Sequence, residues 1–435
     1  MTNGAVASRL DEQGASIAAM SVTAERFAAV IPAARNERIA VGAWALLVLL
    51  ALPGVLGPWD PRIGAATVVP IAAGLIGWRL LPGVADRASW RALCFVAPVA
   101  AAAWAVALAG ADGFAALTEP VRRAGEYLTT AAALDSPSRF LGSFSDSLAG
   151  YGTHVRGHPP GMPLLLWAMS RAGLGGAGWA AAMMIGGGAA AVAAAMIAVR
   201  EVAGEPAARA ATPFLVFAPA AVWIATSADA LFAGVGAWAV ALGVIATGRE
   251  GARSRGAAAA GGVLMGIAMM LTYGAVLLAA VPAAIAWRRR RLDCAASFVT
   301  GTLMVLAVFA AAGFWWPAGL LATRRAYLSG VAQDRGYWFS LAANLGALGL
   351  AIGPAAAAAM VRMRRHAAGA LVAGGVAAVA LADLSGMSKG ETERIWLLFV
   401  PWLVIACAAL PNRRAWLAAQ IAVALGVQTM IATPW

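Results

Sequence analysis

The chain has 435 residues, of which 62% are hydrophobic and 12% are charged, and its formal net charge is +12. A soluble domain averages roughly 45–50% apolar and about 25% charged residues, so the composition excludes a water-soluble enzyme, a disordered chain and a nucleic-acid-binding module. It predicts an all-α, polytopic membrane protein whose first partner is the lipid bilayer. In such proteins an excess of Arg and Lys reports which loops face the cytosol, so the charge does not indicate a polyanionic partner.

The first 38 residues are polar and carry both signs of charge. They lack the apolar core and the cleavage site of a signal peptide, so we expect a disordered cytosolic tail over 1–38. A membrane-spanning helix needs roughly 20 apolar residues, and about thirteen later segments approach this length. They are 39–57, 63–82, 92–110, 178–199, 208–226, 229–247, 257–271, 273–287, 294–314, 339–361, 368–385, 395–410 and 415–431. The first two form an N-terminal extension over 39–91.

Two segments decide the topology. A single helix over 257–287 would be about 45 Å long, and Thr272, Tyr273 and Gly274 interrupt it, so we expect a hairpin of two short helices. The segment 161–172 is expected to be re-entrant or interfacial, because a crossing there would invert every later Arg cluster. The clusters then all face the cytosol, as the positive-inside rule requires. This topology predicts a multi-pass plasma-membrane protein with a cytosolic N-terminus and an external active face.

The longest connection, 111–177, lies outside in this topology, and a connection of that length suggests function. Apolar residues recur at helical spacing over 117–131, which predicts an amphipathic helix. Ser136 and Pro137 are typical of a second helix start, and its apolar positions continue to Tyr151. We expect both helices to lie on the outer membrane surface.

Glu126 and Asp112 are the candidate general bases. A base must reach an acceptor hydroxyl, and desolvation beside a bilayer raises the pKa of a carboxyl toward the range that suits this role. Glu126 is the first choice because the expected surface helix fixes its height at the interface, although it could instead be an exposed acid facing Arg122 or Arg123. Asp112 follows the 92–110 span, where it could equally be a solvated turn acid.

The densest polar motif contains His154, Arg156 and His158, directly before Pro159 and Pro160. The forked guanidinium of Arg suits phosphate oxygens, so this turn is a candidate site for a lipid-linked phosphate. The His-x-x-x-His spacing has no third ligand nearby and is weak for zinc. The alternative is a helix-start turn whose polar side chains are hydrogen-bonded within the protein.

Two further segments complete the candidate set. Asp229 opens a span on the outer side, where a carboxylate either takes part in binding or stabilises the helix N-terminus. The loop 389–396 carries Lys389, the only lysine, and Arg394; it could hold a diphosphate or a sugar, or be a salt-bridged connection. No Gly-rich nucleotide loop, serine elbow or Cys/His metal pattern is present, so the sequence does not indicate a divalent metal, and we expect a membrane-borne substrate.

These residues resemble the GT-C superfamily of integral-membrane glycosyltransferases. Glu126-Tyr127 is similar to that family's Asp-Glu-x-x-Tyr region, and His158-Pro159-Pro160 to its His/Lys-Pro-Pro turn. The similarity covers about 92–290, with a looser counterpart in 389–396. Within it, 200–209 looks like the family's cytosolic turn between two spans. Asp229 looks like the acid that opens the next outer loop, and 262–273 looks like the family's Gly-rich helix pair. The sequence departs from the family at Gly125, in place of an acid, and at Thr272-Tyr273, in place of a frequent Lys.

The resemblance implies a catalytic module over 92–290, followed by a transmembrane bundle over 291–435. It implies a polyprenyl-phosphate sugar as donor, with a sugar such as mannose or arabinose, and transfer to an envelope glycan or lipid at the outer face. Glu126 or Asp112 would deprotonate the acceptor, while Arg156, His158 and Arg394 would stabilise the departing phosphate. The alternatives are a transporter or flippase for a lipid-linked substrate and a non-catalytic protein of an envelope assembly.

Overall fold

The computed structural model describes residues 34–51, 60–225, 227–330 and 332–431. In this part of the chain it contains helices and no strand, which confirms the all-α class. Among the described residues, 7 helices are long and apolar enough to cross a membrane, so the fold is that of a multi-pass membrane protein. They are α3 (Val68–Arg87) with the turn before it, α4 (Trp90–Ala109), α10 (Ala177–Ala203), α12 (Ala228–Thr247), α13 (Gly251–Leu271), α15 (Leu292–Ala311) and α17 (Tyr337–Met360).

The count of about thirteen spans is not confirmed, because several expected spans are short or broken. The segment 208–226 forms α11 (Glu205–Val216) and then a 3-10 helix, Pro219–Trp223. Ala218 between them is non-helical, as expected for a residue before proline. The segment 395–410 lies in a pair, Thr392–Leu398 and Val400–Ala409, bent by 79°, and α18 (Gly369–Leu384) is apolar but shorter than a span.

The first helix of the described residues, α2 (Arg35–Ala51), begins inside the segment predicted to be a tail. Glu37 in its first turn is buried and pairs with Arg362, which follows α17, so this end of α2 is held by the fold. Residues 1–33 of the predicted tail and the end of the predicted span 39–57 lie outside the described residues.

The chain turns back at Thr272, as the interruption predicted. Helix α13 ends at Leu271, and the chain continues as the 3-10 helix Tyr273–Ala279 and α14 (Ala280–Arg288). After α14, the Arg291 side chain donates to the carbonyls of Thr247 and Arg249, just before α13. The end of α14 therefore lies beside the start of α13, and the two form a hairpin.

Helix α17 is interrupted at Gly353, whose φ is +75°. Pro354 follows, and the backbone groups freed at this break are bonded by Gln420 of α21 (Arg413–Met430). The Gln420 amide donates to Ile352 O at 2.8 Å and accepts from Ala355 N at 3.2 Å. A Cβ at position 353 would collide with this amide, so glycine is required both by the backbone angle and by the close approach.

The long connection folds into a series of short helices. They are Phe114–Leu117, α5 (Glu119–Arg122), α6 (Tyr127–Ala132), α7 (Pro137–Ser143), Leu148–Gly150, α8 (Thr153–Gly157) and α9 (Gly161–Arg171). The single helix expected over 117–131 is wrong, because the chain leaves the helix after α5 and Gly125 takes a left-handed φ of +100°. The second start is confirmed, since Ser136 Oγ accepts from Arg139 N, but α7 ends at Ser143, well before Tyr151.

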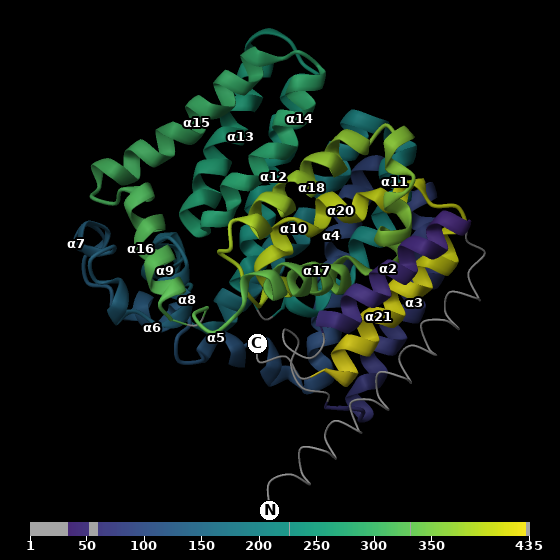
Figure 1. Cartoon of the computed structure of the whole chain (residues 1–435), viewed down its shortest axis with the longest axis horizontal. Helices are drawn as coiled ribbons and strands as arrows, with labels where there is room; N and C mark the ends of the chain where they lie inside the picture. Colours follow the sequence, from purple (N-terminus) through teal and green to yellow (C-terminus); the bar gives the residue numbers. More distant parts are fainter. Residues whose placement is uncertain (1–33, 52–59, 226, 331, 432–435) are drawn as a thin grey trace, which may run out of the picture.

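Helix α9 is too short to span a membrane, which fits the re-entrant or interfacial position expected for 161–172. Its 11 residues give a length of about 16 Å, far short of the roughly 30 Å of hydrocarbon. Gly161 lies so close to the carbonyl of Met270 at the end of α13 that a Cβ there would clash. Figure 1 shows α5 to α9 and α16 (Trp316–Leu328) grouped at the lower left, with α2, α3, α17 and α21 on the right.

Arginine contacts tie the helix connections together at one end of the molecule. Arg209 of α11 donates to the carbonyls of Ala85 and Ala88 between α3 and α4. Arg289 after α14 pairs with Glu201 of α10 at 3.1 Å. The short helices before α10 lie at its other end, where an apolar cluster joins α6 to α9 with the first turns of α10 and α12. The predicted grouping of these basic loops on one side thus agrees with the structure.

Candidate functional site

A close approach of two glycines brings α6 next to α8. His154 N donates to Gly125 O at 3.2 Å, and a Cβ on Gly152 would lie 2.6 Å from Gly125 Cα. Since Cβ atoms essentially never come that close, only glycine at 152 permits this approach without a backbone shift. Gly125, with its φ of +100°, serves the chain reversal that places Glu126 before α6.

Glu126 and His154 form the first half of the site. Glu126 Oε1 lies 3.1 Å from His154 Nε2. On the other side of the ring, Arg394 Nη2 is 3.3 Å from His154 Nδ1. Because arginine can only donate, Nδ1 accepts, and the proton of the neutral ring is assigned to Nε2, which donates to Glu126. His154 therefore links the carboxyl to the guanidinium.

Burial sets the protonation of this pair. Desolvation, aided by the charges of Asp229 and Glu391, raises the pKa of Glu126 to about 7, against the lowering effect of Arg394. Burial and the nearby Arg394 cation lower the pKa of His154, which keeps its ring neutral. A carboxyl group with such a pKa is suited to accept a proton at physiological pH.

Arg394 forms the second half of the site. It lies in the short helix α19 (Thr392–Ile395), and its side chain is 4% exposed. Its Nη1 is 3.2 Å from Asp229 Oδ2, and its Nη2 is 2.6 Å from Glu391 Oε2. Asp229 is equally buried, whereas the Glu391 side chain is 34% exposed. One guanidinium thus joins a buried carboxylate on α12 to a more accessible one on the loop before α19.

The sequence positions both acids locally. Ser227 caps α12, accepting from Asp229 N at 3.0 Å and donating to Asp229 Oδ2 at 2.7 Å, so Asp229 is oriented by the cap as well as by Arg394. Glu391 has a φ of +58° and follows Gly390, another residue in a left-handed conformation. Asn344 of α17 holds the same loop, because its side-chain amide donates a hydrogen bond to Ser388 O at 2.6 Å.

His158 and Tyr127 form the apolar side of the site. The Tyr127 ring centroid lies 6.2 Å from that of His154 and 6.1 Å from that of His158. Burial is the main cause that lowers the pKa of His158 and keeps it neutral, and its ring has a backbone hydrogen bond with Leu271. His158 Nδ1 is buried and has no hydrogen-bond partner among the described residues. It is therefore a buried polar atom whose hydrogen-bonding capacity is unused at the edge of the cluster.

The structure brings together Glu126, His154, His158, Asp229 and Arg394, which come from four distant segments of the chain. It does not place the other three candidates in this contact network. Asp112 pairs with Arg62 at 2.6 Å and accepts from Gln428. Arg156 is half-buried in α8, and its carbonyl accepts from Thr323 Oγ1. Lys389 Nζ donates to Ala332 O and Arg335 O, so it ties two loops together.

Sequence reasoning missed three contributors. Glu391 belonged to the loop considered, but nothing in the pattern distinguished it from its neighbours. Ser227 could have been found as a helix cap, because it precedes an acid and an apolar run. The role of Gly152 depends on a contact with Gly125, which no local pattern indicates. Within the described residues, no group of three His, Cys, Asp or Glu side chains is placed to hold a metal ion.

Fold and site together define a multi-pass, all-helical membrane protein with a buried charged cluster at one end of its helices. No family model matches the sequence, and no curated protein matches it. Among solved structures it is similar to the crystal structure of ArnT from Cupriavidus metallidurans in the apo state, with a TM-score of 0.41 and 20% identity over 66% of this chain. The match covers 58% of that chain.

Proposed function

We propose that this protein transfers a sugar from a polyprenyl-phosphate carrier to a hydroxyl of an envelope glycan or lipid, at the outer face of the plasma membrane. The observation that carries the proposal is the contact of Glu126 with His154 beside the buried pair of Arg394 and Asp229. It unites a carboxyl group able to accept a proton near pH 7 with a guanidinium able to bind a phosphate oxygen. Both lie beside apolar helices, where a lipid-linked substrate is present.

In this mechanism Glu126 is the base. It takes the proton of the acceptor hydroxyl as the acceptor oxygen forms its bond to the anomeric carbon. The bond from that carbon to the carrier phosphate breaks, and its electron pair leaves with the phosphate, so the displacement inverts the anomeric centre. His154 orients the carboxyl through its Nε2 proton. Asp112 is the weaker candidate for the base, because its carboxylate is already engaged by Arg62 and Gln428.

Arg394 stabilises the leaving phosphate. Its Nη1 stays on the buried Asp229, while its Nη2 is held by the more exposed Glu391. An incoming phosphate oxygen replaces the Glu391 carboxylate on Nη2, and the Asp229 contact keeps the guanidinium in position. His158 Nδ1, which is buried beside the cluster, accepts a hydrogen bond from a sugar hydroxyl. Arg156 lies in the segment of His154 and His158, and Lys389 lies in the segment of Arg394. Both contribute positive charge toward the carrier phosphate.

The test is transfer of labelled sugar from polyprenyl-phosphate mannose or arabinose to envelope extract, by protein reconstituted in liposomes. Glu126→Gln is expected to lower the rate by about 100-fold or more, the usual effect of removing a general base. Glu119→Gln is the matched control, because Glu119 is an exposed acid of α5 in the same connection. Wild-type protein that transfers neither sugar, or a Glu126→Gln protein as active as the control, would contradict the proposal.

A further inference from the structure

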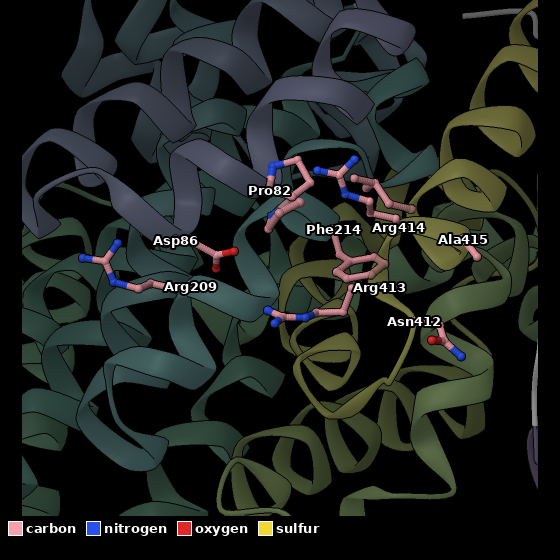
Figure 2. Close-up of a pocket in the computed structure, with 10 residues that line it drawn as sticks. Pro82, Asp86, Arg209, Phe214, Asn412, Arg413, Arg414 and Ala415 are labelled. Carbon is pink, nitrogen blue, oxygen red and sulfur yellow. The ribbon is translucent and has the colours of Figure 1, made fainter.

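A cavity of about 530 Å³ lies between α3, α11 and the start of α21 (Figure 2). Its polar lining is formed by Asp86, Arg209, Asn412, Arg413 and Arg414, and its apolar wall includes Pro82 and Phe214. Figure 2 shows the side chains of Arg413 and Arg414 near Pro82 and Phe214, with Asp86 farther to the side. The volume is within the range of small-molecule sites.

The cavity and the candidate site described above lie at opposite ends of the helices. Asp86 is in the last turns of α3 and Arg209 in the first turns of α11, directly after α10. Glu126, His154 and Asp229 instead lie near the first turns of α10 and α12. The 27 residues of α10 separate the two ends by about 40 Å. The cavity is therefore a different site.

The arginines of the cavity differ in how they are bonded. Arg209 pairs with Glu205 and donates to two backbone carbonyls, so its charge is largely compensated. Neither the Arg413 nor the Arg414 guanidinium has a hydrogen-bond or ion-pair partner among the described residues. Their backbone is fixed, since Arg414 O accepts from Trp78 Nε1 of α3 at 2.9 Å. Two forked donors are thus presented at the rim of a preformed cavity.

The surroundings favour a lipid as the source of the anion. Few residues in the apolar stretch of α3 are buried by the rest of the protein, and Leu75, Ile76 and Leu80 are exposed. A lipid acyl chain that leaves the cavity past Pro82 contacts this apolar surface. The surface lies within the membrane in any arrangement in which α3 spans the membrane. The guanidinium fork matches phosphate oxygens. Cavity, unpaired donors and apolar surface together describe a site for an amphiphile with a phosphate headgroup.

We propose that the cavity between α3, α11 and α21 binds the phosphate monoester headgroup of a membrane lipid, through Arg413 and Arg414. The negatively charged headgroup is the ionic partner that the two guanidiniums lack. The acyl part of the lipid lies along α3. The site stands independently of the function proposed above, because the cavity shares no residue with the charged cluster at the other end of the helices.

The test measures lipid retention by native mass spectrometry and the Tm of the full chain in phosphatidylcholine nanodiscs. The probes are added phosphatidate, phosphatidylglycerol as a phosphodiester lipid, and inorganic phosphate. Wild-type protein is expected to retain phosphatidate and to gain Tm from it, with a smaller gain from phosphatidylglycerol. The double variant Arg413→Gln/Arg414→Gln is expected to bind phosphatidate about tenfold more weakly or worse.

The matched control is Arg364→Gln/Arg365→Gln, an exposed arginine pair outside the cavity. It reports the attraction that any basic surface has for anionic lipid. Equal loss in the two double variants, or no binding of phosphatidate, would overturn the site, and equal protection by inorganic phosphate would overturn the lipid as its ligand. Arg413→Lys/Arg414→Lys keeps the charge without the fork, so unchanged phosphatidate affinity in that variant would contradict recognition by the guanidinium geometry. The Tm without added lipid shows that each variant is folded.

Discussion

Removing the Arg394 side chain should test whether the charged cluster holds the fold of the site together. Arg394→Met leaves Asp229, whose side chain is 4% exposed, with its negative charge and only the Ser227 hydroxyl as a hydrogen-bond donor among the contacts described above. Breaking a buried ion pair from one side costs about 3–5 kcal/mol. We therefore expect the free energy of unfolding to fall by about this amount, measured by denaturant titration in detergent micelles.

A second substitution, at Asp229, distinguishes loss of the ion pair from simple loss of packing. Asp229→Asn combined with Arg394→Met removes both charges, so the double variant should be more stable than the sum of the single effects implies, by about 0.5–3 kcal/mol. Arg171→Met is the control: Arg171 is exposed at the end of α9, and its replacement should change stability by less than about 0.5 kcal/mol. Additive single effects, or an Arg394→Met protein as stable as the control, would refute the assignment.

Four further outcomes are expected. Because the pKa of Glu126 is raised to about 7 and the base must be deprotonated, the transfer rate should rise with pH and level off above about pH 7; a flat profile would exclude Glu126. Gly152→Ala should push against Gly125 and separate α6 from α8, which thermal unfolding and a lower transfer rate would report. Asp112→Asn should lower Tm while transfer continues, whereas loss of transfer in folded protein would restore Asp112 as the base. Gln420→Leu should destabilise the protein by about 1–3 kcal/mol for each backbone group left unpaired at the break in α17, and an unchanged unfolding free energy would contradict that role.

The features that the sequence predicted well were local. The break at Thr272 and the shortness of the helix after Pro160 follow from residue types and lengths within one segment. The grouping of the arginine loops follows from their distribution along the chain, because charge constrains topology without any knowledge of packing. These features position the site, and they needed no contact between distant residues.

The features that it missed depend on such contacts. The helix expected over 117–131 has correct apolar spacing, but the approach of Gly125 to Gly152 breaks it. The sequence favours Glu126 over Asp112 only through a surface helix that does not form as expected. In the structure the two acids differ by their partners, which are Arg62 for Asp112 and His154 for Glu126. The site itself could be predicted only as separate candidates, since its assembly requires the tertiary fold.

The break in α17 has a consequence for how the protein is made. Backbone groups at membrane depth must be bonded within the protein, because the hydrocarbon offers no partners. Gln420, which bonds Ile352 and Ala355, is synthesised well after them, so α17 leaves the ribosome with a gap that its own segment cannot close. The backbone at the break in α17 therefore gains these two hydrogen bonds only after α21 has been made and has packed against it.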